Sequence, residues 1–115
     1  MPSRQVVAKE LAEVFKVLAH PDRIRLIEEL QDGEKDVNTL AETLGLPGPR
    51  VSQHLSLMKA HRLVAEQRDG RYHRYCLTQP GIAQWIIDGV EFLEGRARVL
   101  PKSKLNAARR LWTSQ

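Results

Sequence analysis

Residues 37–64 read VNTLAETLGLPGPRVSQHLSLMKAHRLV. Apolar side chains recur there at three- and four-residue steps in two blocks, as on one face of an amphipathic helix, and they are Leu40, Ala41, Leu44, Val51, Leu55 and Met58. We expect Asn38 to cap the start of the first helix and Gly45 to end it in a left-handed conformation. A turn at 46–50 then leads into a second helix at 49–60. Two short helices joined in this way predict a helix-turn-helix motif.

The segments on either side of this motif extend it to a winged helix. Apolar periodicity favours further helices at 5–19, 21–30 and 80–95. Strand-forming residues at 63–68 and 71–77 flank Asp69-Gly70, a dipeptide that favours a tight hairpin turn. The order of these elements predicts a mainly α fold, a winged helix-turn-helix with about five helices and a two-stranded β-hairpin wing.

The chain has the length of one compact domain, with 115 residues and a mass of 13.1 kDa. We expect residues 1–99 to form a winged-helix domain for DNA binding and dimerisation, and residues 100–115 a basic extension that could hold one extra C-terminal helix. No apolar run reaches the ~18–20 residues that cross a bilayer, and the start of the chain lacks the apolar region of a signal peptide. The expected location is therefore cytoplasmic, without membrane contact.

The positive charge of the chain is concentrated in its centre. The formal net charge is +4, but residues 1–49 carry −3, whereas residues 50–74 carry +4 and residues 75–115 carry +3. A basic centre next to an acidic first part suggests a face that binds a polyanion such as nucleic acid, and the alternative is an ordinary solvated surface.

Basic and polar side chains of this centre are the predicted DNA contacts. The apolar stripe of the helix at 49–60 leaves Arg50, Ser52 and Gln53 facing outward, and arginine and glutamine can pair with base edges in the major groove. His54 lies nearer the buried edge, so a structural role and a DNA contact are both open. Arginines that flank the hairpin tip can reach the minor groove or the backbone. The full predicted set is Arg50, Ser52, Gln53, His54, Lys59, Arg62, Arg68, Arg71 and Arg74.

The first and last clear helices carry more apolar surface than one small core can cover. We expect these helices to pair with a second copy of the chain in a symmetric dimer. The predicted interface residues are Leu11, Phe15, Ile82, Trp85 and Ile86. The alternative is that the two helices pack only on each other within one chain.

Three segments of the chain carry a family resemblance, and they are LAHPDRIRLIEEL (18–30), VNTLAETLGLPGPRVSQHLSLMKAHRLV (37–64) and RDGRYHRYCL (68–77). Together they look like the ArsR/SmtB family of bacterial repressors, over roughly residues 6–95. The resemblance implies a homodimer that binds double-stranded DNA at a palindromic operator, an imperfect inverted repeat. It also implies an inducer, usually a metal ion or metalloid and sometimes an oxidant.

The metal-sensing residues of that family are not matched in this chain. Zinc-sensing members have ligands near both ends of the last helix of the winged domain. The matching positions here are Gln79, Gly81, Phe92 and Gly95. Soft-metal sensors have two thiolates just before the helix at 38–44, where this chain has Asp36-Val37-Asn38, and Cys76 is the only cysteine. We therefore expect no metal site and no cofactor, and the effector stays unknown.

The sequence favours a homodimeric, sequence-specific DNA-binding transcriptional repressor. An enzyme is not indicated, because the chain shows neither a nucleophile beside a base in a suggestive context nor a phosphate-binding glycine loop. Two alternatives stay open: a winged-helix module for protein interaction or dimerisation, and a repressor that responds to thiol oxidation through Cys76. A lone cysteine on a strand is usually a packing residue, and a redox role would need a partner from a second chain.

Overall fold

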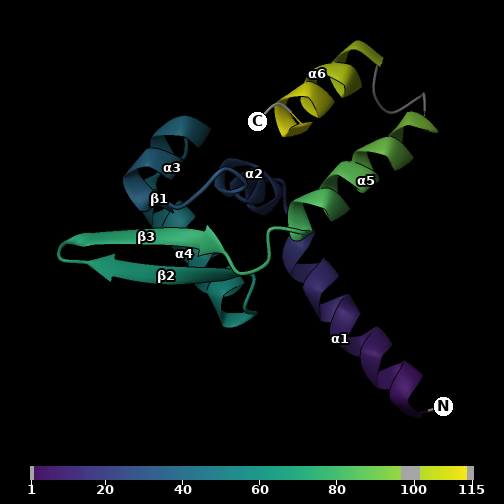
Figure 1. The fold of residues 1–115 in the computed structure, drawn as a ribbon, viewed down its shortest axis with the longest axis horizontal. Coiled ribbons are helices and arrows are strands. Elements are labelled where there is room, and N and C mark those ends of the chain that lie inside the picture. Colours follow the sequence, from purple (N-terminus) through teal and green to yellow (C-terminus); the bar gives the residue numbers. More distant parts are fainter. Residues whose placement is uncertain (1, 97–101, 114–115) are drawn as a thin grey trace. The chain divides into compact units, whose positions relative to one another are not determined.

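The computed structural model describes residues 2–96 and 102–113 (Figure 1). The chain divides into two compact units between Thr78 and Gln79, whereas the boundary expected between 99 and 100 lies outside the described residues. The elements of the first unit are α1 (Pro2–Leu18), α2 (Pro21–Leu30), β1 (Lys35–Asp36), α3 (Val37–Leu44), α4 (Gly48–Ala60), β2 (Val64–Asp69) and β3 (Tyr72–Leu77). Those of the second unit are α5 (Ile82–Glu94) and α6 (Lys102–Thr113).

This order confirms the mainly α winged helix-turn-helix. Among the described helices, none combines the length and the apolar character needed to span a membrane.

The core of the first unit lies where α2, α3 and α4 meet. These three helices contact one another, and α2 and α4 also contact the strands β3 and β2. The largest fully buried side chains are Leu26, Ile27, Leu40, Val51, Leu55, Met58 and Val64. Most of them belong to the apolar stripes that the sequence predicted. Burial of each side chain of this kind contributes about 1.5–3 kcal/mol, so the stripes fix the mutual packing of the helix-turn-helix.

Helix α3 begins at a different cap from the one expected. Asp36, not Asn38, is the N-cap, because its Oδ1 accepts a hydrogen bond of 2.7 Å from the backbone N–H of Thr39. Asp36 is also extended, since it pairs with β3 as part of the short strand β1. Asn38 therefore lies in the first turn of α3. The predicted end of this helix is confirmed, because Gly45 has a left-handed φ of +67°.

The wing has one strand more than the sequence predicted. The sheet has the order β1-β3-β2, and both pairings are antiparallel, so β3 is its central strand. Strand β1 has only two residues, Lys35 and Asp36, and so short a segment shows no alternation that a sequence pattern could reveal. The hairpin of β2 and β3 extends away from the helices of the first unit (Figure 1).

The tip of the hairpin is shifted by one residue from the expected turn. Asp69 pairs with Tyr72, so the two-residue loop is Gly70-Arg71 rather than Asp69-Gly70. Gly70 has a φ of +63°, and Arg71 does not have a positive φ. This is the pattern of a type II′ turn, in which glycine takes the first loop position. The shift places Arg71 in the loop itself.

The second unit consists of two helices that contact each other. Glu94 of α5 forms an ion pair with Arg109 of α6. Helix α6 confirms the extra C-terminal helix that the sequence left open.

Candidate DNA-binding surface

Helix α4 follows a turn made rigid by proline and exposes part of its predicted reading face. Pro47 is the residue before the helix and supplies no side-chain hydrogen bond to it. The backbone N–H groups of Arg50 and Val51 donate instead to the carbonyl oxygen of Pro47, at 3.1 and 3.2 Å. Arg50 and Gln53 are exposed, whereas Ser52 is half-buried.

Asp22 had no predicted role, yet it joins two residues of α4. It lies in the first turn of α2, and its Oδ2 accepts from Nη2 of Arg50 at 2.9 Å and from Nε2 of His54 at 3.2 Å. Its backbone N–H donates to Nδ1 of His20, the N-cap of α2, at 3.0 Å. One carboxylate thus connects the start of α2 to the predicted reading helix.

His54 is turned inward and has a defined protonation state. A carboxylate can only accept and a guanidinium can only donate, so Nε2 donates to Asp22 while Nδ1 accepts from Nη1 of Arg23 at 3.4 Å. Burial lowers the pKa of His54, against the hydrogen bond to Asp22, which raises it. The neutral imidazole therefore satisfies both neighbours at pH 7. This arrangement supports the structural role of His54, and its contact with DNA stays a prediction.

The cluster around Asp22 contains donor atoms of the kind that bind metals. Ligand-type atoms of His20, Asp22 and His54 lie within 4.8 Å of one another. However, Arg23 and Arg50 reach the same cluster, and the positive end of the α2 dipole points at it. A divalent cation there would be repelled by these charges and would have to displace Arg50 from Asp22. The electrostatics therefore support a hydrogen-bonded structural cluster.

Glu66 on β2 is a second carboxylate that gathers basic residues. It accepts from Nζ of Lys59 at 3.0 Å, from Nδ1 of His73 at 2.9 Å and from the Tyr75 hydroxyl at 2.9 Å. Nε of Arg68 lies 3.7 Å away. The hydrogen bond from His73, followed by those from Lys59 and Tyr75, lowers the pKa of Glu66 to about 2. Two predicted DNA contacts, Lys59 and Arg68, are therefore partly neutralised within the protein.

The low pKa of Glu66 predicts a pH-dependent contribution to stability. The carboxyl has an ordinary pKa of 4.5 and a pKa of about 2 in the folded chain. Its contribution is therefore fully present above pH 4.5 and decreases as the pH falls toward 2. In Glu66→Gln, the free energy of unfolding is expected to decrease less over this pH interval than in the unaltered chain. Denaturant unfolding at a series of pH values measures this difference.

A matched control for this experiment is Glu42→Gln. Glu42 is an exposed residue of α3 without an ion pair to any described residue. In Glu42→Gln, the free energy of unfolding is expected to decrease with falling pH as much as in the unaltered chain. If both variants followed the pH profile of the unaltered chain, the hydrogen bonds to Glu66 would not contribute to stability.

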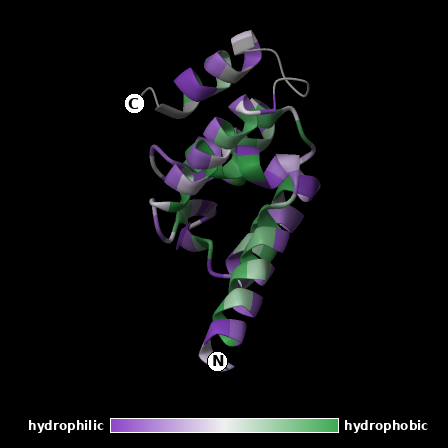
Figure 2. Cartoon of the chain, turned by 90° about the vertical axis from the view of Figure 1, so that its right-hand side faces the viewer, coloured by the Kyte–Doolittle hydropathy of each residue, from purple (hydrophilic) through white to green (hydrophobic). Residues whose placement is uncertain are grey.

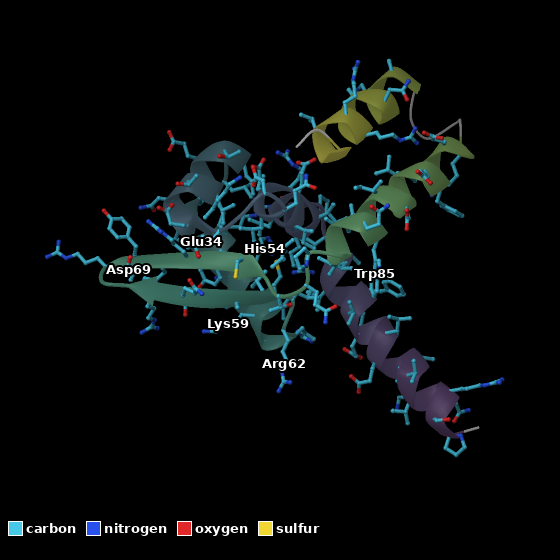
Figure 3. All side chains as sticks on the ribbon, viewed as in Figure 1. Glu34, His54, Lys59, Arg62, Asp69 and Trp85 are labelled. Atoms are coloured by element: carbon cyan, nitrogen blue, oxygen red, sulfur yellow. The ribbon has the colours of Figure 1, made fainter. Side chains whose placement is uncertain are left out.

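The remaining predicted arginines differ in how they are held. Arg74 forms an ion pair with Glu34 at 3.4 Å, whereas Arg71 has no ion pair with any residue in the described part of the chain. Arg62 has a left-handed φ of +60° at the end of α4. The N–H groups of Arg62 and Leu63 turn back to carbonyls of α4 at 2.9 Å each, as in a Schellman motif. This backbone directs Arg62 away from the helix end (Figure 3).

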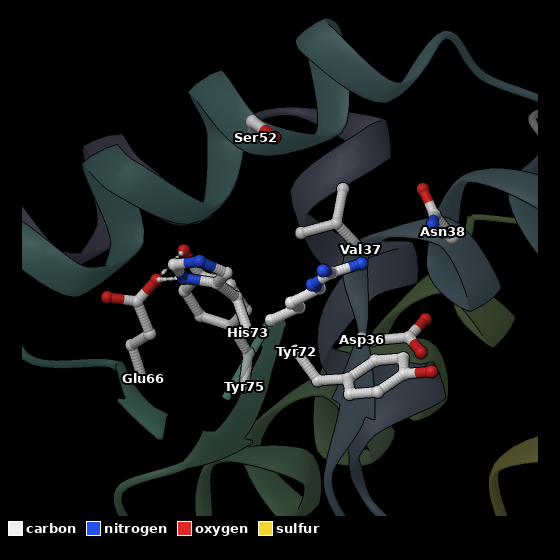
Figure 4. A pocket seen from close by; sticks show the side chains of 9 residues that line it. Asp36, Val37, Asn38, Ser52, Glu66, Tyr72, His73 and Tyr75 are labelled. Carbon is white, nitrogen blue, oxygen red and sulfur yellow. Dashed lines mark hydrogen bonds and ion pairs between the residues drawn. The ribbon is translucent and has the colours of Figure 1, made fainter. Parts of the chain in front are cut away.

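A pocket lies between the wing and the starts of α3 and α4 (Figure 4). Its volume is about 360 Å³, and its lining consists of Asp36, Val37, Asn38, Ser52, Glu66, Arg71, Tyr72, His73 and Tyr75. Both carboxylates of the lining are engaged, since Asp36 caps α3 and Glu66 holds the residues described above. Arg71 and Ser52 thus face one space from two elements that the sequence predicted to touch DNA.

The predicted dimer residues are largely exposed in this single chain. The exposed fractions are 39% for Leu11, 53% for Phe15 and 50% for Trp85, whereas Ile86 is half-buried and Ile82 is buried. Hydrophobic segments repeat along α1 toward the N-terminus (Figure 2). Exposed apolar surface of this kind is typical of a protein–protein interface.

Comparisons with known proteins agree on one family. The model for "Bacterial regulatory protein, arsR family" matches residues 20–66. The HTH-type transcriptional regulator KmtR of Mycobacterium tuberculosis is 38% identical over 89% of this chain and 77% of its own length. The crystal structure of Rv0081 from the same species is 36% identical, with a TM-score of 0.69 over 84% of this chain and 95% of that one. The transcriptional repressor BigR of Xylella fastidiosa is 30% identical, with a TM-score of 0.66 over 74% and 87% of the two chains.

The matched region contains most of the surface described above. Residues 20–66 run from the N-cap of α2 through α4 to Glu66, and so include both Asp22 and Arg50. The hairpin tip with Arg71 lies just beyond this region.

Proposed function

Since this chain belongs to the ArsR family of bacterial regulatory proteins, we propose that it is a homodimeric transcriptional repressor in which α4 reads an imperfect inverted repeat in DNA. Named relatives of similar sequence are transcriptional regulators, and BigR is a repressor. None of the relatives reported above is named as an enzyme.

The observation that carries this proposal is the juxtaposition of α4 and the wing. Arg50 and Gln53 are exposed on α4, and Arg71 lies at the wing tip without an ion pair in the described chain. Arginine and glutamine can each make paired hydrogen bonds to a base edge, and a wing arginine can hold the backbone or the minor groove. The same residues argue against a module that binds only protein, because such a surface gains nothing from outward cations.

Selection of DNA from a random duplex library tests the proposal directly. The purified chain is expected to enrich duplexes that contain an inverted repeat, with half-site centres roughly 10 bp apart or a small multiple of that. Binding is then measured for the enriched duplex and a scrambled one. Equal affinity for both at every salt concentration would contradict sequence-specific reading.

We expect a dimer, because the apolar residues of α1 and α5 remain exposed in one chain. Light scattering at micromolar concentration is expected to give twice the 13.1 kDa chain mass, about 26 kDa. Phe15→Glu is expected to shift the mass toward that of one chain, and the control Leu57→Glu, at an exposed position of α4, to leave it unchanged. A monomer for the unaltered chain would exclude the dimer and, with it, the inverted repeat.

We also expect a repressor without the usual metal sites of the family. The matching positions carry Gln79, Gly81, Phe92 and Gly95, and Cys76 is the single cysteine. Zn²⁺, Cd²⁺, Pb²⁺ and As(III) are therefore expected to change the affinity for the enriched duplex by less than about threefold in fluorescence anisotropy. Stoichiometric zinc binding with loss of DNA affinity would show the opposite.

A further inference from the structure

We propose that Asp22 is a positioning residue that gives this chain its DNA sequence specificity, because it orients Arg50 on α4. The inference rests on the proposed function, in which α4 reads base edges. Asp22 itself lies on α2, outside the α3–α4 helix-turn-helix.

Asp22 is held in place at both its backbone and its side chain. Its N–H donates to the His20 cap, and its Oδ2 accepts from His54 as well as from Arg50. The ring of His20 lies against that of His54, with a centroid distance of 4.5 Å. The carboxylate therefore has little freedom to follow Arg50 if the arginine moves. It is a fixed acceptor to which the guanidinium returns.

A fixed acceptor changes what Arg50 can do. An arginine side chain has many rotamers, and orienting it before binding reduces the entropic cost of ordering it on DNA. Arg50 uses Nη2 for Asp22, and a guanidinium has five N–H donors. The remaining donors can still form a paired contact with a base. Asp22 thus orients the Arg50 side chain and leaves it enough N–H donors to contact a base.

The Asp22 carboxylate also weakens the part of DNA binding that does not depend on sequence. Its negative charge neutralises Arg50 and repels phosphates, so it weakens the attraction that every DNA sequence shares. The other ionisable groups at this site are Arg23, His20 and the neutral His54, and none of them supplies a second negative charge. Removal of the Asp22 charge therefore strengthens binding to scrambled DNA while it weakens binding to the selected sequence.

Glu66 provides a control of equal charge. It also holds cations among the predicted DNA contacts, but these are Lys59 and Arg68, neither of which was predicted to read base edges in the major groove. Glu66→Gln and Asp22→Asn both remove one negative charge and nearly preserve side-chain volume. Only the second disturbs a base-reading residue.

The experiment measures dissociation constants for the library-enriched duplex and a scrambled duplex of equal length, as a function of salt. Asp22→Asn is expected to lower the ratio of specific to scrambled affinity by about tenfold, and to raise the affinity for scrambled DNA. Glu66→Gln is expected to raise both affinities and to keep the ratio within about twofold. In an Arg50→Gln background, Asp22→Asn is expected to leave the ratio unchanged, because the two residues act together.

Two results would overturn the proposal. One is an equal effect of Asp22→Asn on both duplexes, and the other is an equal loss of specificity with and without Arg50. A measurement on the unaltered chain does not depend on the folding of any variant. In NMR relaxation, the side-chain Nε–H of Arg50 is expected to be more ordered than that of Arg71. Equal mobility of the two groups would also overturn the proposal. If the unaltered chain enriched no sequence, the proposed function would fail instead.

Discussion

Leu26→Ala is expected to lower the free energy of unfolding by about 2–5 kcal/mol. Leu26 is fully buried on α2, at the junction where α2 meets α3, α4 and β3. The substitution removes buried apolar surface and leaves a cavity that these packed elements cannot close. Domains of this size are stabilised by only about 5–15 kcal/mol in total, so the change removes a large share of the stability. Denaturant unfolding at a fixed chain concentration measures it, because dimerisation would otherwise add a concentration dependence.

The control for this substitution is Leu57→Ala on α4. Leu57 is 38% exposed, so its truncation removes less buried surface and opens no enclosed cavity. We expect it to cost less than about 1 kcal/mol. Equal effects of the two substitutions would mean that the first unit does not have the packed core described here.

Arg50→Ala is expected to weaken binding to the selected duplex by about 1–3 kcal/mol and to relax the preference at particular base pairs. The guanidinium is half-exposed and held by Asp22, so its loss is expected to remove the oriented base contact that we propose. Gln53→Ala is expected to have an effect of similar size at other base pairs, because Gln53 lies on the exposed face of the same helix. Gel shift or anisotropy with single-base variants of the selected duplex measures both.

Arg71→Ala is expected to act in a different way. Arg71 lies in the two-residue hairpin loop. We expect it to contact DNA without reading a base, so affinity should fall evenly across sequences. The slope of log affinity against log salt should shrink by about one unit. If Arg50→Ala and Arg71→Ala lowered the affinity for selected and scrambled DNA alike, α4 would not be the reading helix. If neither changed binding, a role in protein interaction would be the better interpretation.

Most of the helical architecture was predictable because it depends on local patterns. The stripe with Leu40, Val51 and Leu55 has a helical period, and all three side chains are fully buried. Gly45 was predicted to end α3 in a left-handed conformation because glycine has no Cβ, and its φ of +67° confirms this prediction. Such features require only neighbours a few positions away.

The errors occurred where pairing between strands decided the local structure. Strand β1 exists only because Lys35 and Asp36 pair with β3, and this pairing places the α3 cap at Asp36 instead of Asn38. The hairpin turn shifted by one residue because the register of β2 with β3 pairs Asp69 with Tyr72.

Residue types and spacing in the sequence were sufficient to predict the winged helix-turn-helix and to mark Arg50, Gln53 and Arg71 as outward-facing. Only the tertiary structure decided which of the marked cations are held by carboxylates. Asp22 reaches Arg50 and His54 because α2 packs across α4, and Glu66 reaches Lys59 and His73 because β2 follows α4 and pairs with β3. Hydrophobic periodicity records which face of a helix is buried, but it carries no information on which distant polar group that packing brings within hydrogen-bonding distance.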